Sequence, residues 1–491
     1  MGDHMYKETY KKFVTFGIVL AFLGLIIIPA INAGEINTEN INKVFNKVIL
    51  KSSWQSRLEN INSDCDLLIV TADEFAELLQ PLKTHKDKYG VKTNIVTLSY
   101  VYQEIDYGYD KPEKIKYFIK NAVEESGVKY VLLVGNFRKM PIRYVYNDEP
   151  WPHFPEPYFI SELYYADIYD SEGNFSSWDP DGNGIYGEWN GDEAQDKDID
   201  LYPDVYVGRL ACRFNIEVRI MVNKIIAYET KTYDKDWFKK VTVVAGDTYP
   251  DGQYSFPTPE YEGEVNSEMV LENMSHFEPV RLFTSDGSFS GPEDVINAIN
   301  NGTGFIAFDG HAGPRSWATH KPNSSQWVEG LKNENMIYLR NRNMLPICVA
   351  GACHNAQFDT NLLNFLIQGF ETALNHGTWS PECWGWKLTR KIGGGTIATI
   401  ANTGLGMTKE DKTTREGAGD YMDAQFFYVY GNNLTDILGE VWGIAIGRYL
   451  DAFPIDWNTP SGWDFSYDAK TVQQWVLLGD PSLKIGGYPP Q

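Results

Sequence analysis

Two short stretches decide the fold, FIAFDGH at residues 305–311 and LPICVAGAC at residues 345–353. Each is an apolar run of strand length that ends in small residues and then in one reactive side chain, His311 or Cys353. In open parallel sheets, ligands bind beyond the carboxyl ends of the strands. We therefore expect His311 and Cys353 to lie at one edge of a parallel sheet.

Apolar, strand-like runs alternate with amphipathic, helix-like runs on both sides of these stretches. The alternation begins near residue 64, pauses in an irregular segment rich in Tyr, Trp, Asp and Gly, and starts again near residue 237. It is typical of α/β proteins whose mostly parallel sheets are flanked by helices. We predict two successive α/β subdomains, residues 64–236 with an acidic insertion and residues 237–487 with the reactive side chains. One long helix is expected over residues 424–449.

The composition of the 491-residue chain indicates a folded, acidic protein. Its hydrophobic content of 43% is enough to bury a large core. With 66 acidic and 43 basic residues, the formal net charge is −23. Such a charge repels nucleic acid, so we expect no nucleic-acid partner. The five cysteines are scattered, and two disulfides with one thiol or five free thiols both remain open.

The N-terminus has the pattern of an export signal. Three lysines precede an apolar run at residues 13–28, and small residues follow it. We interpret residues 1–33 as a signal peptide and residues 34–63 as a linker or short pro-segment. The alternative is a retained membrane tether, since a short spanning helix needs only about 17 apolar residues. In both cases the body of the protein is predicted to be secreted or held at the extracellular cell surface.

The two strand ends carry the residue types of nucleophilic catalysis. A thiol attacks a carbonyl as the thiolate, and a nearby imidazole can take its proton and later return it. We therefore expect Cys353 to be the nucleophile and His311 its acid/base. The backbone amides of Cys353, Ala312 and Gly310 are candidate oxyanion donors, and such a donor is worth about 3 kcal/mol in comparable sites. His354 is a competing base, and the plainer alternative is an inert buried thiol beside a core histidine.

Further segments have sequences similar to those of a known protein family. They are DLLIV at residues 66–70, PEKIKYFI at 112–119, VLLVG at 131–135, PDVYVGRL at 203–210 and LLGDPSL at 477–483. Together with the two strand ends, and in this order, they resemble the gingipain family of cysteine peptidases over residues 64–487. The resemblance implies a caspase-like fold of two subdomains, a dyad of His311 and Cys353, and peptide-bond hydrolysis through a thioester. The family usually has Gly where this chain has Ala312, and a positive φ there would cost about 1 kcal/mol.

A second pattern predicts a metal site. Residues 179–188 read DPDGNGIYGE, which alternates oxygen ligands at the spacing of a calcium loop. The predicted ligands of a structural Ca²⁺ are Asp179, Asp181, Asn183, Ile185 and Glu188. Four further acids are candidates for a second site: Asp196, Asp198, Asp200 and Asp204. A solvated acidic loop is the alternative, and no organic cofactor is expected.

The segment SELYY at residues 161–165 bears on specificity. It resembles the segment that supplies the pocket carboxylate in arginine-directed gingipains, which implies Glu162 opposite a basic substrate side chain. The leading hypothesis is an exported cysteine endopeptidase that cleaves proteins or peptides after Arg or Lys. One alternative is a sortase-like transpeptidase, which resolves the same thioester with an amine. The other is an inactive, calcium-stabilised binding module, for which a lost Cys or His would be the expected signature.

Overall fold

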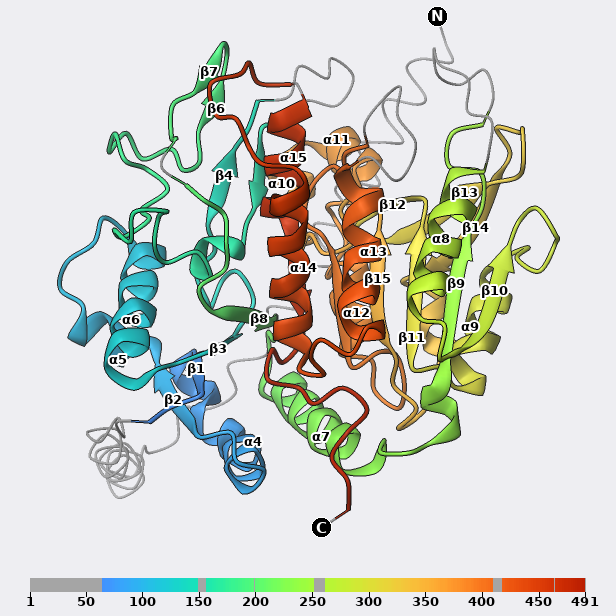
Figure 1. Cartoon of the computed structure of the whole chain (residues 1–491), viewed down its shortest axis with the longest axis horizontal. Coiled ribbons are helices and arrows are strands. Elements are labelled where there is room, and N and C mark those ends of the chain that lie inside the picture. The colour runs from blue at the N-terminus through green and yellow to red at the C-terminus, as the bar shows by residue number, and fades with distance from the viewer. Residues whose placement is uncertain are drawn as a thin grey trace, which may run out of the picture. The chain divides into compact units, whose positions relative to one another are not determined.

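The computed structural model describes residues 64–148, 156–197, 199–250, 261–408, 417–462 and 464–490. Residues Ile61–Gln491 form one compact unit, in which two sheets are flanked by helices (Figure 1). The predicted signal segment, residues 1–33, and the linker, residues 34–63, lie outside the described residues. Within these described ranges, no helix is long and apolar enough to span a membrane.

The first sheet has four parallel strands in the order β2-β1-β3-β8. They are β1 (Leu67–Thr71), β2 (Thr93–Thr97), β3 (Tyr130–Val134) and β8 (Tyr206–Leu210). Its helices are η1 (Asp73–Phe75), α4 (Ala76–Lys88), α5 (Leu98–Glu104), α6 (Lys111–Ser126) and α7 (Asn215–Lys231). Every residue of the two central strands, β1 and β3, is buried. Such continuous apolar strands are expected where helices cover both faces of a parallel sheet.

The second sheet has six strands in the order β10-β9-β11-β15-β16-β17, and only the edge strand β17 runs antiparallel to its neighbour. They are β9 (Lys240–Ala245), β10 (Glu278–Phe283), β11 (Phe305–Asp309), β15 (Ile347–Gly351), β16 (Ala398–Asn402) and β17 (Trp475–Leu478). The helices after β9 are α8 (Glu262–Asn273), α9 (Pro292–Asn301), η4 (Asn335–Tyr338), α10 (Asn364–Ile367), α11 (Phe370–Asn375), α12 (Trp384–Thr389), α13 (Ala418–Gly431), α14 (Leu438–Ala452) and α15 (Asp464–Gln474). In Figure 1, α8, α13 and α14 lie in front of this sheet.

The two sheets meet where β8 contacts β17. A Cβ atom on Gly208 would lie only 2.5 Å from the carbonyl oxygen of Gly479, so this approach requires glycine. The predicted α/β class with two mostly parallel sheets is confirmed. The single long helix predicted over residues 424–449 is wrong, because α13 ends at Gly431 and Asn433 adopts a left-handed φ of 57° before α14 begins.

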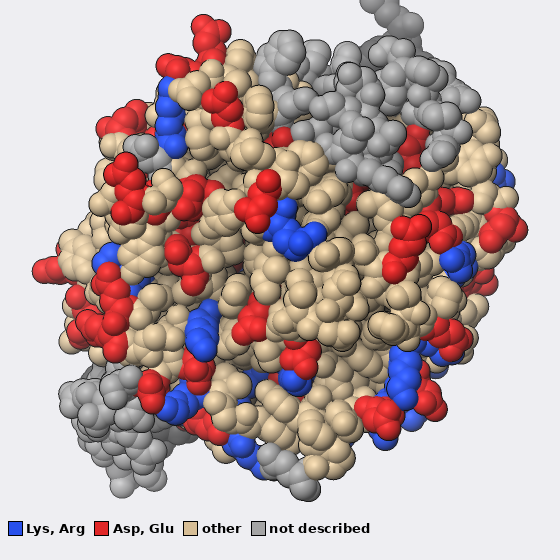
Figure 2. Space-filling view, viewed as in Figure 1, with Lys and Arg blue, Asp and Glu red and all other residues tan. Residues whose placement is uncertain are grey.

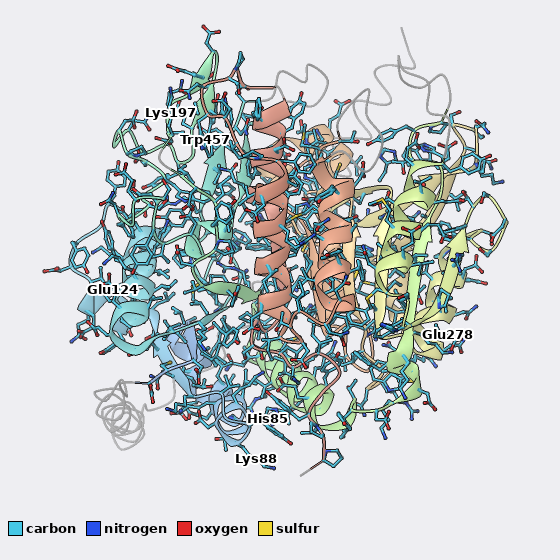
Figure 3. All side chains as sticks on the ribbon, viewed as in Figure 1. His85, Lys88, Glu124, Lys197, Glu278 and Trp457 are labelled. Atoms are coloured by element: carbon cyan, nitrogen blue, oxygen red, sulfur yellow. The ribbon has the colours of Figure 1, made fainter. Side chains whose placement is uncertain are left out.

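Smaller elements fill the connections. An antiparallel sheet follows β11 and contains β12 (His311–Gly313), β13 (Ser316–His320) and β14 (Trp327–Lys332). The insertion in the first half carries β4 (Tyr144–Tyr146), β5 (Tyr158–Ile160), η2 (Leu163–Tyr165), β6 (Trp189–Asn190) and β7 (Glu193–Ala194), and η3 (Asp236–Lys239) leads into β9. The insertion is anchored on the loop between α14 and α15, where Lys197 donates to Asn458 at 2.9 Å and the Trp189 ring packs on Trp457 (Figure 3).

The structure also shows the state of the cysteines and the distribution of charge on the surface. All five cysteines are free thiols, which settles the disulfide question left open by the sequence. Cys348 lies inside β15 and is fully buried, so it belongs to the core. Acidic side chains spread over the face seen in Figure 2, with fewer basic ones between them, in keeping with the net charge of −23.

Candidate active site

The pairing of β11 with β15 decides where His311 and Cys353 lie. These strands are parallel neighbours whose last pair is Asp309 with Gly351, and the Gly310 amide donates to the Gly351 carbonyl at 3.3 Å. His311 and Cys353 each stand two positions beyond that pair. The structure therefore brings both predicted residues to the carboxyl edge of adjacent strands, where α/β proteins bind ligands.

Glycines allow the chain to turn tightly at this edge. A Cβ atom on Gly351 would lie 1.7 Å from Oδ2 of Asp423, a buried residue of α13. Gly310 has a φ of 157°, and a Cβ atom there would lie 3.0 Å from the Ala318 carbonyl oxygen. The small residues that the sequence places before His311 and Cys353 are thus required by close packing.

The Cys353 thiol lies in a partly enclosed position. The Gly406 amide donates a hydrogen bond to its Sγ atom at 3.2 Å. Burial raises the pKa of the Cys353 thiol to about 11, the Gly406 amide lowers this pKa, and the charge of Glu156 raises it. The thiol is therefore protonated at neutral pH, and it needs a base before it can attack a carbonyl.

His311 is held in one orientation. Its Nε2 atom lies 2.8 Å from the carbonyl oxygen of Thr248. Because a carbonyl can only accept, Nε2 carries the hydrogen and Nδ1 is left as the acceptor. Burial lowers the pKa of His311, so the ring is neutral at neutral pH. The ring centroids of Tyr249 and Trp327 lie 5.7 and 5.3 Å away. His311 thus has the protonation state and the tautomer that a general base requires.

His354 is a weaker candidate for the base. It is buried in a left-handed conformation with a φ of 57°, and its Nδ1 atom lies 3.4 Å from Oε1 of Glu156. Burial lowers the pKa of His354 to about 4. An imidazole of such low basicity is a poor proton acceptor for a thiol whose own pKa is raised.

Two acids on this side of the site were not found by sequence reasoning, namely Glu156, whose charge acts on Cys353, and Asp359, whose charge acts on Glu156. The Glu156 carboxylate accepts from the Leu405 amide at 2.7 Å, and burial raises the pKa of Glu156 to about 8. Asp359 accepts from the Tyr144 hydroxyl at 2.7 Å, and its charge contributes to the raised pKa of Glu156. Neither acid follows a motif, because both reach the site through loops whose course depends on the tertiary structure.

The three predicted oxyanion donors have different surroundings. The Gly310 amide already donates to Gly351 in the sheet, so this prediction is corrected. Ala312 pairs with Trp317 in the β12–β13 hairpin and does not have a positive φ, so alanine at this position brings no strain. The Cys353 amide makes no hydrogen bond within the described part of the chain, and it remains the simplest candidate.

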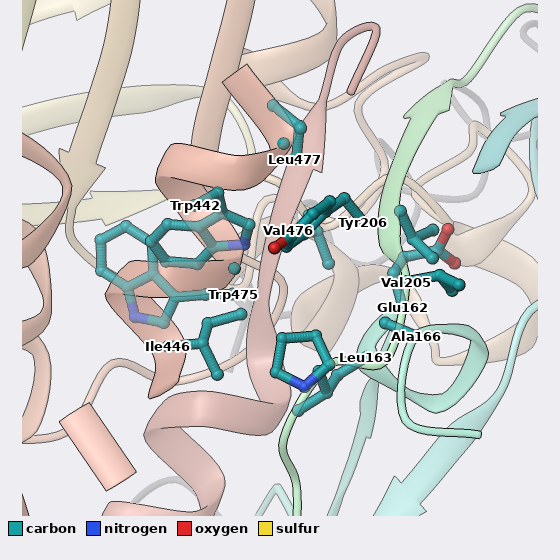
Figure 4. Close-up of a pocket in the computed structure, with 14 residues that line it drawn as sticks. Glu162, Leu163, Ala166, Val205, Tyr206, Trp442, Ile446, Trp475, Val476 and Leu477 are labelled. Atoms are coloured by element: carbon teal, nitrogen blue, oxygen red, sulfur yellow. The ribbon is translucent and has the colours of Figure 1, made fainter. Parts of the chain in front are cut away.

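Glu162 is not placed as the sequence predicted. Its two oxygens accept from Nε and Nη2 of Arg209 at 2.7 and 2.9 Å. Glu162 is 5% exposed and Arg209 is 0% exposed. Figure 4 shows Glu162 beside the apolar side chains of the cavity where β8 meets β17, with its carboxylate pointing away from them. A carboxylate already paired in this way is not available to a substrate side chain, so the predicted role is corrected.

The predicted calcium loop gathers only part of its proposed ligand set. Carboxylate oxygens of Asp179, Asp181 and Asp196 all lie within 4.8 Å of one another. The Glu188 carboxylate accepts from the Asn183 side chain at 2.8 Å, and the amide of Ile185 donates to Asn183 at 2.7 Å. The sequence had assigned Asp196 to a second site. Asp198, another member of that proposed site, lies outside the described residues.

Comparison with known proteins places this arrangement in a family. The model of peptidase family C25 matches residues 60–486. The chain belongs to peptidase family C25. Gingipain R2 of Porphyromonas gingivalis strain W83 is 19% identical over 424 residues, which cover 85% of this chain and 46% of that protein. Lys-gingipain HG66 of the same species is 25% identical over 164 residues, covering 33% of this chain and 8% of that protein. The chain thus spans less than half the length of these curated relatives.

Two solved structures of RgpB share the fold. The Arg-specific cysteine proteinase gingipain R (RgpB) superimposes with a TM-score of 0.58 at 18% identity, over 87% of this chain and 79% of that chain. The complex of the P. gingivalis RgpB pro- and mature domains gives 0.57 at 18% identity, over 86% and 79%. The caspase-like fold that the family resemblance implied is therefore confirmed.

Proposed function

We propose that this member of family C25 is a cysteine endopeptidase in which Cys353 attacks the peptide carbonyl and His311 transfers the proton. The observation that carries the proposal is the β11–β15 register, which brings both side chains to the same edge of the sheet. The Thr248 carbonyl adds to it by fixing the His311 tautomer, so that Nδ1 is the proton acceptor.

The proposed reaction has two halves. In acylation, His311 takes the Cys353 proton, and the thiolate attacks the carbonyl to form a tetrahedral oxyanion beside the Cys353 amide. The protonated His311 then gives its proton to the leaving amine, which leaves a thioester on Sγ. In deacylation, His311 takes a proton from water, the hydroxide attacks the thioester, and the proton returns to Sγ as the acid leaves. The Gly406 amide is the candidate to stabilise the thiolate. The Ala312 amide is the candidate for a second oxyanion donor.

We also propose that the enzyme prefers Arg or Lys as the residue before the scissile bond. Relatives of this chain are named for arginine and lysine. We propose that Glu156 and Asp359, rather than Glu162, face the basic side chain, because Glu156 lies near Cys353 and Asp359 lies near Glu156. Burial raises the pKa of both acids. A bound guanidinium or ammonium group would favour their ionised forms, so binding would release a proton.

We further propose that the enzyme acts outside the cytoplasm on protein or peptide substrates. Membership of a peptidase family supports substrates of this class. The lysines and apolar run within residues 1–33 have the order of an export signal, and this pattern supports the location.

The test is cleavage of a fluorogenic peptide library that varies the residue before the scissile bond. We expect the wild type to cleave and Cys353→Ala to lose all turnover, because the variant lacks the thiol that attacks the carbonyl in the proposed reaction. His311→Ala should lose about 10²-fold or more, which is the usual contribution of a general base. Circular dichroism and melting temperature must match the wild type in both variants. Turnover by a folded Cys353→Ala variant would refute the proposal.

The same library decides the specificity. We expect Asp359→Asn to lower kcat/KM for Arg and Lys substrates relative to uncharged ones by about tenfold, the effect of one lost charged hydrogen bond. Glu162→Gln is the matched acid-to-amide control, and it should melt at a lower temperature with the substrate preference unchanged. A changed preference in Glu162→Gln with none in Asp359→Asn would restore the role that the sequence suggested for Glu162.

A further inference from the structure

An exposed tryptophan lies beside the proposed acid/base. Of the tryptophans that the structure describes, only Trp327 is exposed, with 51% of its surface accessible. Its ring centroid lies 5.3 Å from that of His311 and 3.8 Å from that of His320. A ring of this size is mostly buried in other proteins, so its exposure beside a residue that meets the substrate in the proposed reaction calls for an explanation.

The register of the small antiparallel sheet puts these three rings on one face. His311 of β12 pairs with Ala318 of β13, and His320 of β13 pairs with Trp327 of β14. Residues directly opposite each other on paired strands share a face, and so do residues two positions apart on one strand. Ala318 and His320 are two positions apart, so one ring from each strand lies on the same face of the sheet.

The other face of this sheet belongs to the core. Trp317 is 0% exposed and Val328 is 5% exposed. The Trp317 ring lies 5.8 Å from that of Phe289 and 5.3 Å from that of Phe308, between ring centroids. The core therefore holds the sheet in place and leaves the face that carries Trp327 turned outward.

The order of the strands decides which part of a substrate reaches that face. Strands β9, β11, β15 and β16 are consecutive neighbours in the large sheet. His311 follows β11, Cys353 follows β15, and Leu405, whose amide binds Glu156, follows β16. In the proposed reaction the peptide carbonyl lies at Cys353 and the leaving amine at His311. The residue before the scissile bond then lies on the β16 side, and the residue after it lies on the β9 side.

The face with Trp327 lies on the β9 side. The Asp247 amide, just beyond β9, donates to the His320 carbonyl at 3.3 Å, which attaches β13 beside that strand. His320 is 1% exposed, so the Trp327 ring rests on a fixed partner. A substrate residue that follows the scissile bond therefore meets His311 first and Trp327 next.

The chemistry of the face is apolar. Burial lowers the pKa of His311 and that of His320, so both rings are neutral at neutral pH. Glu329, two positions after Trp327, is paired with Lys332 at 2.6 Å. A surface of neutral rings gains most from covering another apolar surface, because contact removes both from water.

We propose that Trp327 is the wall of the subsite for the residue after the scissile bond, and that it selects a large apolar or aromatic side chain there. The inference rests on the proposed peptidase function and extends it to the side of the scissile bond that leaves with the amine. Trp327 takes no part in the proton transfers, so its loss should change the preference without abolishing cleavage.

The experiment uses quenched fluorogenic peptides that differ only after the scissile bond, where they carry Phe, Leu or Gly. The residue before the bond is the one that the full chain cleaves best. We expect kcat/KM of the wild type to be about tenfold higher with Phe or Leu than with Gly, as for other apolar subsites. Trp327→Ala should bring this ratio close to one, and Trp327→Phe should keep most of it.

A matched control is Phe214→Ala, which removes another exposed aromatic ring, 61% accessible, just before α7. It should keep the wild-type ratio. All variants should keep the wild-type preference for the residue before the scissile bond and the wild-type Tm. If Trp327→Ala melts at a lower temperature, Trp327→Thr replaces it, because Thr favours strands.

Binding of the same peptides to Cys353→Ala, followed by calorimetry, tests the subsite without turnover. There Trp327→Ala should weaken binding of the Phe peptide about tenfold and leave that of the Gly peptide nearly unchanged. This binding pattern without cleavage by the wild type would refute the proposed hydrolysis and keep the subsite. Three outcomes would overturn the inference: equal binding of the three peptides by the parent, an equal loss of kcat/KM for all peptides in Trp327→Ala, or selection of Arg or Lys after the bond through a cation–π contact.

Discussion

At the scale of single residues, the environment of Cys353 decides how the thiol is activated. Some cysteine enzymes hold a preformed thiolate beside a charged imidazole, which depresses the thiol pKa. Here burial raises the pKa of Cys353 to about 11 and lowers that of His311. Both shifts favour the neutral forms, so the resting pair is a thiol and an imidazole. In the proposed reaction, proton transfer accompanies the attack on the substrate, and the fixed His311 tautomer prepares for it.

A resting pair of neutral thiol and neutral imidazole predicts how the alkylation rate of Cys353 depends on pH. The rate of iodoacetamide attack on Cys353, followed by mass spectrometry of its peptide, should rise about tenfold per pH unit from pH 7 to pH 10, because only the thiolate reacts. His311→Gln should leave the slope unchanged. The other four thiols are buried and serve as internal controls. A plateau that begins near pH 6 or 7 would indicate a preformed ion pair and contradict the assignment.

At the scale of elements, the site depends on how closely α13 packs against the end of β15. The Asp423 side chain occupies the space that any Cβ atom on Gly351 would need. Asp423 is buried, and burial raises its pKa well above the ordinary value. The carboxyl group therefore cannot swing into water without opening the sheet edge, and the position of Cys353 depends on this contact.

Gly351→Ala tests that contact. We expect the free energy of unfolding to fall by about 2 kcal/mol, as for other overpacked cores, and turnover to fall because the Cys353 turn shifts. Gly447→Ala is the matched control, because that helical position is open apart from Tyr202 at 3.8 Å, and alanine favours helix. The double variant Gly351→Ala/Asp423→Ala should recover part of the loss. If Gly351→Ala melts like the wild type, the packing argument fails.

At the scale of the whole molecule, α7 links the two sheets. Lys224 on this helix lies close to the turn that leads from α12 into β16. Its ammonium group donates to the carbonyls of Gly394 and Thr396 at 3.0 and 2.8 Å, and also to those of Thr389 and Lys391. An ammonium group has three N–H donors, so the Lys224 side chain from the first half is shared among these four carbonyls of the second half. Unpaired buried acceptors are costly, so this contact stabilises the joint between the halves.

Lys224→Met keeps the apolar stem and removes the donor. We expect the free energy of unfolding to fall by about 2 kcal/mol, seen as a lower Tm by calorimetry. Lys231→Met, on an exposed position at the end of the same helix, should change it by no more than about 0.5 kcal/mol. Equal melting of the two variants would show that the carbonyls find other donors.

Local patterns in the sequence were enough to predict the α/β class, the strands that end at His311 and Cys353, and the acidic loop at Asp179 and Asp181. These features depend on periodicity and on short-range turn residues, which neighbouring positions encode directly. Because parallel neighbouring strands end at the same edge of a sheet, the sequence also predicted that His311 and Cys353 meet there. The break at Gly431 was missed, although Gly431, Asn432 and Asn433 form a helix-stop signal between two apolar runs.

Other features depend on contacts between distant segments. The Thr248 carbonyl that orients His311 has no side-chain signature, and the same is true of the Gly406 amide on Cys353. Glu162 looked like a substrate ligand until the fold placed Arg209 against it, and Asp196 lies beside Asp179 and Asp181 although the sequence assigned it to a different group of acids. The sequence by itself determined which elements form and where the reactive residues stand on them. Only the tertiary structure decided their partners, because strand register and loop course bring together residues that no local pattern relates.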